Sequence, residues 1–453
     1  MTVTNTDLAA AAQRALAAAA AAGADEAEAW CEESTSRQIR AYDGAVESLS
    51  DAGARGLGLR VFVGARAGYA YGTDLTGDGM DGLALAAVGA ARVADEDEHA
   101  GLPEELGTTE VGGLSSPALA DWSTERKVEL ALEVERAARA HAGVSQVEDS
   151  VYADSEGRVA LANSRGFAAG YEATAAWAYC SAFAGEGADL MTGLGVGLAR
   201  DPGGLDPAAI GDEAAERALS LMGARQPESR RCPVVLDAFV AASFLGFIGG
   251  MVSADAVQRG RSLFADKEGE EIAAPELRLA DDATDPGGLE SAPFDGEGAP
   301  ARRTALIEDG RLVSFLFDAR TARKAGRAST GSAGRGSYRV PPSVSTKNLV
   351  LEPGDAALDG LLSRAGDGLY VTDVAGLHSG VNPVSGTFSV GASGRLIEGG
   401  ELGAPVREIT IASDLVSMLR SVQAVGSDTR WVPFGGSVKA APLLLGEMSV
   451  SGA

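Results

Sequence analysis

The sequence predicts an α+β protein in which two small α+β units are followed by a larger, strand-rich C-terminal domain. Three observations lead to this prediction. The 453 residues exceed what one hydrophobic core usually supports. Helical apolar patterns dominate parts of the first half, whereas short strand-like segments and glycine turns fill the second half. The 60 glycines, gathered in small-residue clusters, are typical of many turns and short strands.

The first unit is expected over residues 1–94. Its alanine-rich start, which ends at Gly23, predicts a helix that packs closely on a sheet. Alternating apolar residues after it predict strands and a hairpin. In order, the expected elements are a helix over 8–22 with a cap signal at Thr4, strands over 27–33 and 37–42, a hairpin of 57–63 and 67–71, and a helix over 83–93.

Residues 95–120 begin with four consecutive acidic residues and continue with proline and glycine, which predicts a linker or a long surface loop. A second α+β unit is expected over 121–225. Its expected elements are a helix over 123–141, strands over 147–152, 158–163 and 167–183 with turns at 156–157 and 165–166, and a helix from Asp206 to Gly223.

A polar break over 224–231 precedes the C-terminal domain, which we expect over 232–453. Short strands and glycine turns predominate there, and one late helix is expected at about 413–421. The series Gly193, Gly195, Gly197 lacks the helix that a dinucleotide-binding loop requires, because Asp201 and Pro202 follow, so it is interpreted as part of a strand.

The formal net charge of −26 makes nucleic acid and anionic lipid unfavourable partners, because no basic field offsets the repulsion. We therefore expect no nucleic acid and no membrane partner. No apolar run reaches the roughly 20 residues of a membrane span, and no signal peptide is recognised. Three widely spaced cysteines favour reduced thiols over a disulfide framework. The expected location is the cytoplasm.

The chain offers few residues for hydrolytic chemistry. Its three histidines, His99, His141 and His378, lie in different segments, so no pair has the spacing of a zinc site, and no G-x-S-x-G elbow is present. Hydroxyl residues near His378 are interpreted as turn residues. The acidic residues at 281, 282, 285 and 290 do not have EF-hand spacing and are interpreted as a solvated loop. Asp295 and Glu297 suit either acid–base work or a turn, and the turn is preferred.

Four segments carry a resemblance to a known family. They are GARGLGLRVFVGARAGYAYGTDL at 53–75, FDGEGAPARRTALIEDGRL at 294–312, STGSAGRGSYRVPPSVSTKNLVLEPG at 329–354, and GLHSGVNPVSGTFSVGASGRLIEGGE at 376–401. The chain resembles the TldD/PmbA family along nearly its whole length. TldD-type members hold zinc with an HExxxH motif and a later cysteine. The matching segment here, 241–250, has no His, Glu or Cys, and 426–442 has no Cys. The resemblance therefore favours the TldE (PmbA) branch.

The resemblance implies a metal-free subunit of a heterodimeric TldD/TldE peptidase, inactive alone, which lines a chamber for unfolded peptide. It implies no cofactor in this chain and zinc in the TldD-type partner. Extended peptide could bind there by strand addition. Residues in the matched polar loops that could bind peptide backbone are Asn348, His378, Asn382, Ser385, Thr387 and Ser389. The alternative is that these residues only cap glycine turns.

Two other functions stay open. The family also carries a label as a modulator of DNA gyrase, which suggests a regulatory binding protein without a peptidase role. The third possibility is a partner in peptide or amide trimming within a biosynthetic pathway. We also expect a homodimer when the chain is isolated, because an exposed partner-binding surface tends to find cover.

Overall fold

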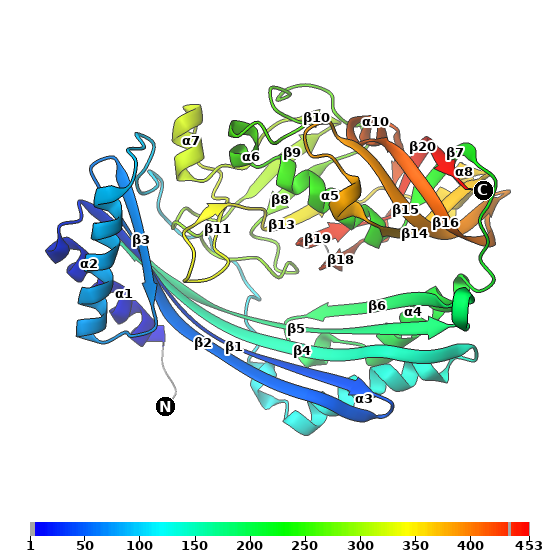
Figure 1. Cartoon of the computed structure of the whole chain (residues 1–453), viewed down its shortest axis with the longest axis horizontal. Coiled ribbons are helices and arrows are strands. Elements are labelled where there is room, and N and C mark those ends of the chain that lie inside the picture. Colours follow the sequence, from blue (N-terminus) through cyan, green and yellow to red (C-terminus); the bar gives the residue numbers. More distant parts are fainter. Residues whose placement is uncertain (1–4, 434–435, 453) are drawn as a thin grey trace.

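The computed structural model describes residues 5–433 and 436–452 and has the predicted α+β fold, with a long curved sheet facing a strand-rich C-terminal domain (Figure 1). The curved sheet takes strands from both N-terminal sequence units, so the two units share one sheet. Its order is β3-β2-β1-β4-β5-β6, and every neighbouring pair is antiparallel. The strands are β1 (Glu26–Tyr42), β2 (Ala45–Val63), β3 (Arg66–Gly72), β4 (Val144–Asn163), β5 (Ala168–Ala184) and β6 (Met191–Ala199).

Two breaks predicted in this sheet were wrong. The expected strands at 27–33 and 37–42 form one strand, β1, and the expected turn at 156–157 lies inside β4. Gly157 pairs with Ser34 on one side and Ala173 on the other. Hydrogen bonding on both sides carries a strand through residues that, alone, favour a turn. The predicted hairpin of β2 and β3 and the turn at 165–166 are confirmed.

Four helices cover this sheet in two pairs. One end carries α1 (Asn5–Ala22) and α2 (Gly77–Val93), and the other carries α3 (Thr124–Ala140) and α4 (Pro207–Ser220). The predicted cap at Asp206 is confirmed, since its side chain accepts from the backbone N of Ala209. The cap signal at Thr4 lies outside the described residues. Short 3-10 turns lie at Pro117–Asp121, Gly187–Asp189 and Pro202–Gly204.

Within the segment 95–120, predicted as a linker or a long surface loop, residues 97–109 are hydrogen-bonded to the C-terminal domain, whereas Leu114 and Ser116 are bonded to the central unit. Leu102 is fully buried. The side chain of Arg323 donates to the carbonyl oxygens of His99 and Leu102, and Thr109 Oγ1 donates to the Ala301 carbonyl at 2.6 Å. Hydrogen bonds from side chains to main-chain carbonyl groups anchor this segment, which its composition did not indicate.

The C-terminal domain has two six-stranded sheets, ordered β16-β15-β14-β7-β20-β17 and β10-β9-β8-β13-β19-β18. The first closes on itself because β16 also pairs with β20. Its strands are β7 (Arg230–Leu236), β14 (Gly368–Ala375), β15 (Thr387–Glu398), β16 (Glu401–Asp414), β17 (Val422–Val425) and β20 (Leu443–Ser451). The second has β8 (Leu279–Asp282), β9 (Arg303–Glu308), β10 (Arg311–Leu312), β13 (Asn348–Leu351), β18 (Arg430–Val432) and β19 (Ser437–Ala440).

The helix α5 (Ala238–Met251) packs between these two sheets, because it contacts β7 and β14 of one and β13, β18 and β19 of the other. A two-stranded ribbon is formed by β11 (Ala333–Gly334) and β12 (Ser343–Val344). The remaining helices are α6 (Ala254–Gln258), α7 (Ala319–Ala325), α8 (Leu358–Ala365), α9 (Leu377–Gly380) and α10 (Leu415–Arg420). The last of these confirms the predicted late helix.

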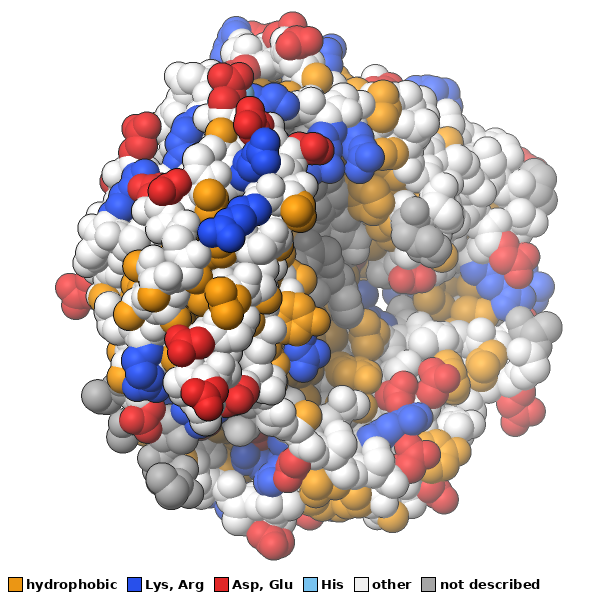
Figure 2. All heavy atoms as spheres, turned by 60° about the vertical axis from the view of Figure 1, so that its left-hand side comes forward, with side chains coloured by type: hydrophobic (Ala, Val, Ile, Leu, Met, Phe, Trp, Pro, Cys, Tyr) orange, Lys and Arg blue, Asp and Glu red, His pale blue; other side chains and the backbone are white. Residues whose placement is uncertain are grey.

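The surface is hollowed towards the middle of the face shown in Figure 2, and acidic and basic side chains are interspersed over that face. Among the described residues, no helix is long and apolar enough to cross a membrane. The three cysteines are free and buried in the sheets.

Candidate functional site

The helix α5 is buried except for one face, which is partly exposed. Its sequence is almost entirely apolar, which favours burial on all sides. Ten of its residues are indeed buried. The four that are not are Ser243, Gly246, Phe247 and Gly250. Because these positions are three, four and seven residues apart, they form a single stripe along the helix.

This stripe lines a groove of about 560 Å³. Phe247 and Met251 supply apolar surface from α5, and Leu377 of α9 and Pro383 form the opposite rim. Arg261 is the charged residue of the lining. Glycine at 250 keeps the groove open, since nothing lies within 4 Å of where its Cβ would stand.

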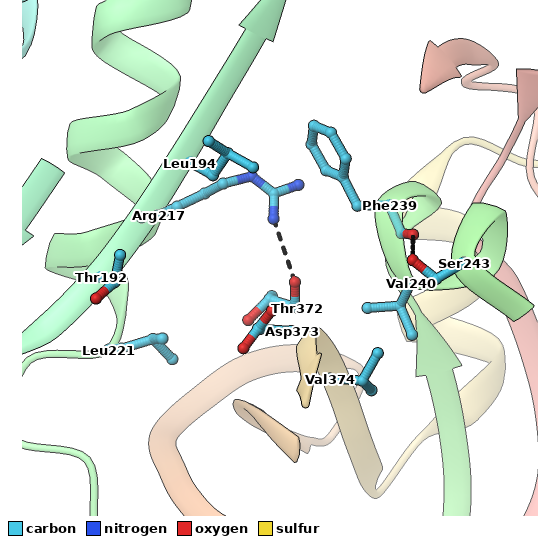
Figure 3. A pocket seen from close by; sticks show the side chains of 11 residues that line it. Thr192, Leu194, Arg217, Leu221, Phe239, Val240, Ser243, Thr372, Asp373 and Val374 are labelled. Atoms are coloured by element: carbon cyan, nitrogen blue, oxygen red, sulfur yellow. Dashed lines mark hydrogen bonds between the residues drawn. The ribbon is translucent and has the colours of Figure 1, made fainter. Parts of the chain in front are cut away.

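A smaller pocket of about 180 Å³ continues from the same helix towards its N-terminus, and Ser243 lines both (Figure 3). The central unit contributes Thr192 and Leu194 of β6 and Arg217 of α4, while β14 contributes Thr372, Asp373 and Val374. The two pockets together form a path along α5, which we call the α5 groove.

An ion network fixes the N-terminal end of α5. Asp237 accepts from the backbone N of Phe239 at 2.9 Å, from Arg217 at 2.8 Å and from the Tyr370 hydroxyl at 2.8 Å. Burial by itself lowers the pKa of Arg217, but Asp237 outweighs it and the pKa is raised. The guanidinium of Arg217 lies 4.4 Å from the ring centroid of Phe239, and Arg430 lies 4.2 Å from it. These contacts join α4 to α5 and hold the groove wall in place.

Asp373 is the carboxylate of the smaller pocket. Asp373 is exposed, and partial desolvation of its carboxyl by the surrounding residues raises its pKa. The backbone N of Val374 is the hydrogen-bond donor that faces it. The side chain of Arg217 already donates hydrogen bonds to Asp237 at 2.8 Å and to the Thr372 carbonyl at 3.3 Å. A carboxylate in this position suits a cationic or hydrogen-bond-donating ligand.

The structure gathers three of the sequence-predicted site residues in one exposed turn beside the groove rim. Asn382 Oδ1 accepts from the backbone N of Val384 and Ser385, and Ser385 Oγ lies 2.8 Å from Thr387 Oγ1. Ser389 is exposed on β15. His378 belongs to α9, and its side chain lies outside the described part of the chain. These contacts agree with the turn-capping alternative and leave the exposed hydroxyls accessible.

Asn348 lies elsewhere. It is fully buried in β13, where its amide nitrogen donates to the Asp282 carbonyl at 2.7 Å and to Ser291 Oγ at 2.8 Å. Its oxygen accepts from the backbone N of Glu290 at 3.2 Å. Asn348 therefore has its hydrogen bonds inside the protein and presents no surface to a ligand.

The acidic pairs noted in the sequence also have structural partners. Asp295 accepts from the backbone N of Glu297, Ala299 and Ala333, which confirms the turn interpretation. Asp281 and Asp282 are buried in β8, so the expectation of a solvated loop was wrong for them. Strand pairing of β8 with β13 and β9 draws both residues inside.

Comparison with known proteins identifies the family. Residues 27–91, 117–222 and 229–452 match models of domain 1, the central domain and the C-terminal domain of the PmbA/TldA metallopeptidases. The chain belongs to the PmbA/TldD family. It is 29% identical to Metalloprotease PmbA of Escherichia coli O157:H7 over 431 residues, which is 94% of this chain and 92% of that protein.

Solved structures of other proteins have the same fold. A proposed modulator of a DNA gyrase from Thermotoga maritima superimposes with a TM-score of 0.89 at 27% identity, covering 98% of this chain and 99% of that one. TldE from Thermococcus kodakarensis superimposes with a TM-score of 0.91 and covers 98% and 100%. At 22% identity the latter shows the shared fold.

A metallopeptidase family implies a metal ion, and the donor groups of the α5 groove do not fit one. Zinc takes imidazole nitrogen, thiolate or carboxylate, whereas the open face of α5 presents a hydroxyl, two glycines and a phenyl ring. Within residues 5–433 and 436–452, no three His, Cys, Asp or Glu side chains form a group that could hold a metal.

Sequence reasoning missed the residues that line the groove, among them Ser243, Phe247, Gly250 and Asp373. One signal was available. Ser243, Gly246 and Gly250 interrupt an apolar run with the period of a helix, so one side of the helix lacks the large apolar side chains of a fully buried helix. Asp373 carried no local signal, because its position depends on how β14 faces α4.

Proposed function

We propose that this chain is the non-metal-binding subunit of a heterodimeric TldD/TldE-type zinc metallopeptidase that degrades or processes unfolded peptides. It contributes chamber wall and substrate binding, the TldD-type partner holds the zinc, and the chain is inactive alone. The observation that carries this proposal is the open face of α5, which lines a groove and carries no metal donor.

The length of α5 suits an extended peptide as ligand. The 14 residues of α5 span roughly 20 Å at 1.5 Å per residue. An extended peptide rises about 3.3 Å per residue, so about six residues fit along the helix. Apolar surface from Phe247 and Met251 would receive side chains, and the hydroxyl of Ser243 could contact the peptide backbone.

The exposed turn at the groove rim supplies the remaining proposed contacts. Asn382, Ser385, Thr387 and Ser389 keep accessible polar atoms, and His378 belongs to the adjoining helix. We propose these residues as backbone-contacting groups. Asn348 is left out because its side chain is buried and already hydrogen-bonded.

Metal analysis combined with peptide hydrolysis tests this function. The purified chain and the TldD-type protein of the same genome are assayed for zinc and for hydrolysis of an unfolded peptide, separately and after mixing. We expect a zinc-free, inactive chain that enters an active complex on mixing. Stoichiometric zinc with activity in the lone chain would falsify the proposal.

Size measurement on the same samples tests two related proposals. We expect the isolated chain to be a homodimer and to form a heterodimer with the TldD-type protein on mixing, because the same surface would form both interfaces. We further propose that the complex is cytoplasmic.

The solved structure described as a proposed gyrase modulator suggests a competing function, that of a regulatory binding protein. Salt-sensitive binding to gyrase without the TldD-type protein would favour it.

A further inference from the structure

A separate pocket of about 460 Å³ lies outside the α5 groove. Leu198 of β6 forms one wall, and Val432 of β18 and Ser437 of β19 lie in the C-terminal domain. The segment 343–347 forms another side. Thr346 in this segment packs on α5, because a Cβ on Gly249 would lie 3.0 Å from its methyl group. The pocket therefore lies on a different side of α5 from the groove.

Five polar side chains of this pocket have no side-chain partner among the described residues. Lys347 forms no ion pair within the described residues, and the same part of the chain offers no hydrogen bond to four hydroxyl side chains of the lining: Ser343, Ser345, Thr346 and Ser437. Ion pairs and side-chain hydrogen bonds are plentiful elsewhere in this protein. Five unpartnered donors around one pocket are consistent with a bound acceptor.

Two of these donors, Ser345 Oγ and Lys347 Nζ, lie close to the backbone of Gly334. A Cβ on Gly334 would lie 1.9 Å from Ser345 Oγ and 3.8 Å from Lys347 Nζ. Glycine at 334 is therefore required for the hydroxyl to approach so closely. The ammonium and the hydroxyl lie on the same side of this backbone, so both could bind one polar group of a ligand.

Of the two cationic side chains that line the pocket, Lys347 and Arg335, Lys347 is the one that can bind a ligand. Arg335 also lines the pocket, but its guanidinium is buried and held by Glu28 and the Gly296 carbonyl. Asp281 lies behind Lys347 and accepts from its backbone N at 2.8 Å. Burial raises the pKa of Asp281 to about 7, which weakens its opposing charge near neutral pH. Glu290 is the carboxylate of the lining and is exposed.

We propose that this pocket binds a carboxylate, either the C-terminal carboxylate of a peptide or that of a free aliphatic acid. The Lys347 ammonium with several hydroxyl donors matches a single negative charge. A phosphate ester with its two charges would be under-compensated. The apolar walls formed by Leu198, Leu289, Val432 and Pro433 receive the aliphatic part of the ligand. This site requires no peptidase partner.

Binding to the full-length chain tests the proposal by calorimetry. The probes are N-acetyl-leucine, its carboxamide, an N-acetylated Ala-Ala-Leu peptide with a free C-terminus, and inorganic phosphate. We expect both acids to bind and the carboxamide to bind at least about tenfold more weakly, because the charge-assisted hydrogen bond is lost. A tighter peptide identifies a peptide C-terminus as the ligand, and equal affinities identify a free acid.

Lys347→Gln should weaken both acids by about tenfold or more. Lys324→Gln is the matched control, since Lys324 is an exposed lysine of α7 that does not line the pocket, and it should leave binding unchanged. If Lys347→Gln does not fold, Ser345→Ala provides the second variant and should weaken the acids too. Equal binding of acid and carboxamide, phosphate binding as tight as the acids, unchanged binding in the folded variant, or no acid binding at millimolar concentration would each overturn the proposal.

Discussion

Arg60 of β2 lies 2.8 Å from Glu297 of the C-terminal domain, and both side chains are almost completely buried. The same guanidinium lies 2.8 Å from Glu28 of β1. Glu297 also accepts from the backbone N of Ala319, at the start of α7. One carboxylate therefore connects the curved sheet to two parts of the C-terminal domain.

Glu297→Gln should destabilise the protein by about 3 kcal/mol, because it leaves a buried guanidinium with one of its two carboxylates. Urea unfolding followed by circular dichroism measures this change. Glu129→Gln is the control, since Glu129 pairs with Arg136 at 2.6 Å on the open surface of α3. Surface pairs contribute little. An equal shift of both midpoints would show that the buried position of Glu297 is unimportant.

Asp281 should make the protein less stable as pH rises from about 4 to about 7. Burial raises its pKa from 3.8 to about 7, so between these values the folded chain holds a proton that the unfolded chain releases. Folding then costs more as pH rises, and the cost is constant above pH 7. Asp281→Asn should flatten the decline of the unfolding free energy across this window, measured by urea titrations at several pH values.

Asp51→Asn gives a control of opposite sign. The hydrogen bond from Arg37 at 2.7 Å lowers the pKa of Asp51, so its stabilisation is present above the unfolded pKa and is lost as pH falls. The variant should therefore differ from the native chain near neutral pH and approach it in acid. A steeper decline in Asp281→Asn than in the native chain would contradict the assignment to Asp281.

Gly195→Ala should destabilise the contact between β6 and α4 by about 2 kcal/mol or more, since overpacked side chains force the backbone to shift. A Cβ at this position would lie 2.0 Å from the Ile210 carbonyl oxygen and 2.9 Å from the Ala214 nitrogen. Gly157→Ala is the matched control, because it changes a strand glycine with nothing within 4 Å of the new methyl group. Thermal melting compares the two, and Gly157→Ala should melt no lower than the native chain.

The sequence could predict those parts of the fold that depend on local signals. The alanine-rich run identified α1, helical periodicity identified α3 and the cap at Asp206 identified α4, because those signals are local. The length of β1 and β4 depended on partners far along the chain, so local turn residues such as Gly157 predicted breaks that pairing removes. The segment 95–120 was predicted as a linker or a long surface loop because its anchors, such as Arg323, lie more than 200 residues away.

The candidate site was predictable to a similar degree. The resemblance directed attention to α5 and to the turn around Asn382, and the structure places the two beside one groove. Residue type alone could not separate the exposed Ser385 from the buried Asn348, since both are small polar residues in matched loops. Burial is a property of the assembled sheets, and in this chain it decides which polar residues are accessible.

Gly250→Leu should lower peptide hydrolysis by the complex with the TldD-type protein, because the new side chain fills the α5 groove. Space for it exists on the helix, where nothing lies within 4 Å of the glycine, so folding should be preserved. Displacing a substrate by about 1 Å can cost a large factor in rate, and we expect a loss of about tenfold in kcat/KM. Gly89→Leu is the matched control: Gly89 is an exposed helical glycine of α2 with the same free space. Assembly is checked by gel filtration, so that a loss of rate with an intact complex points to the groove. An unchanged rate in Gly250→Leu would place the peptide path away from α5.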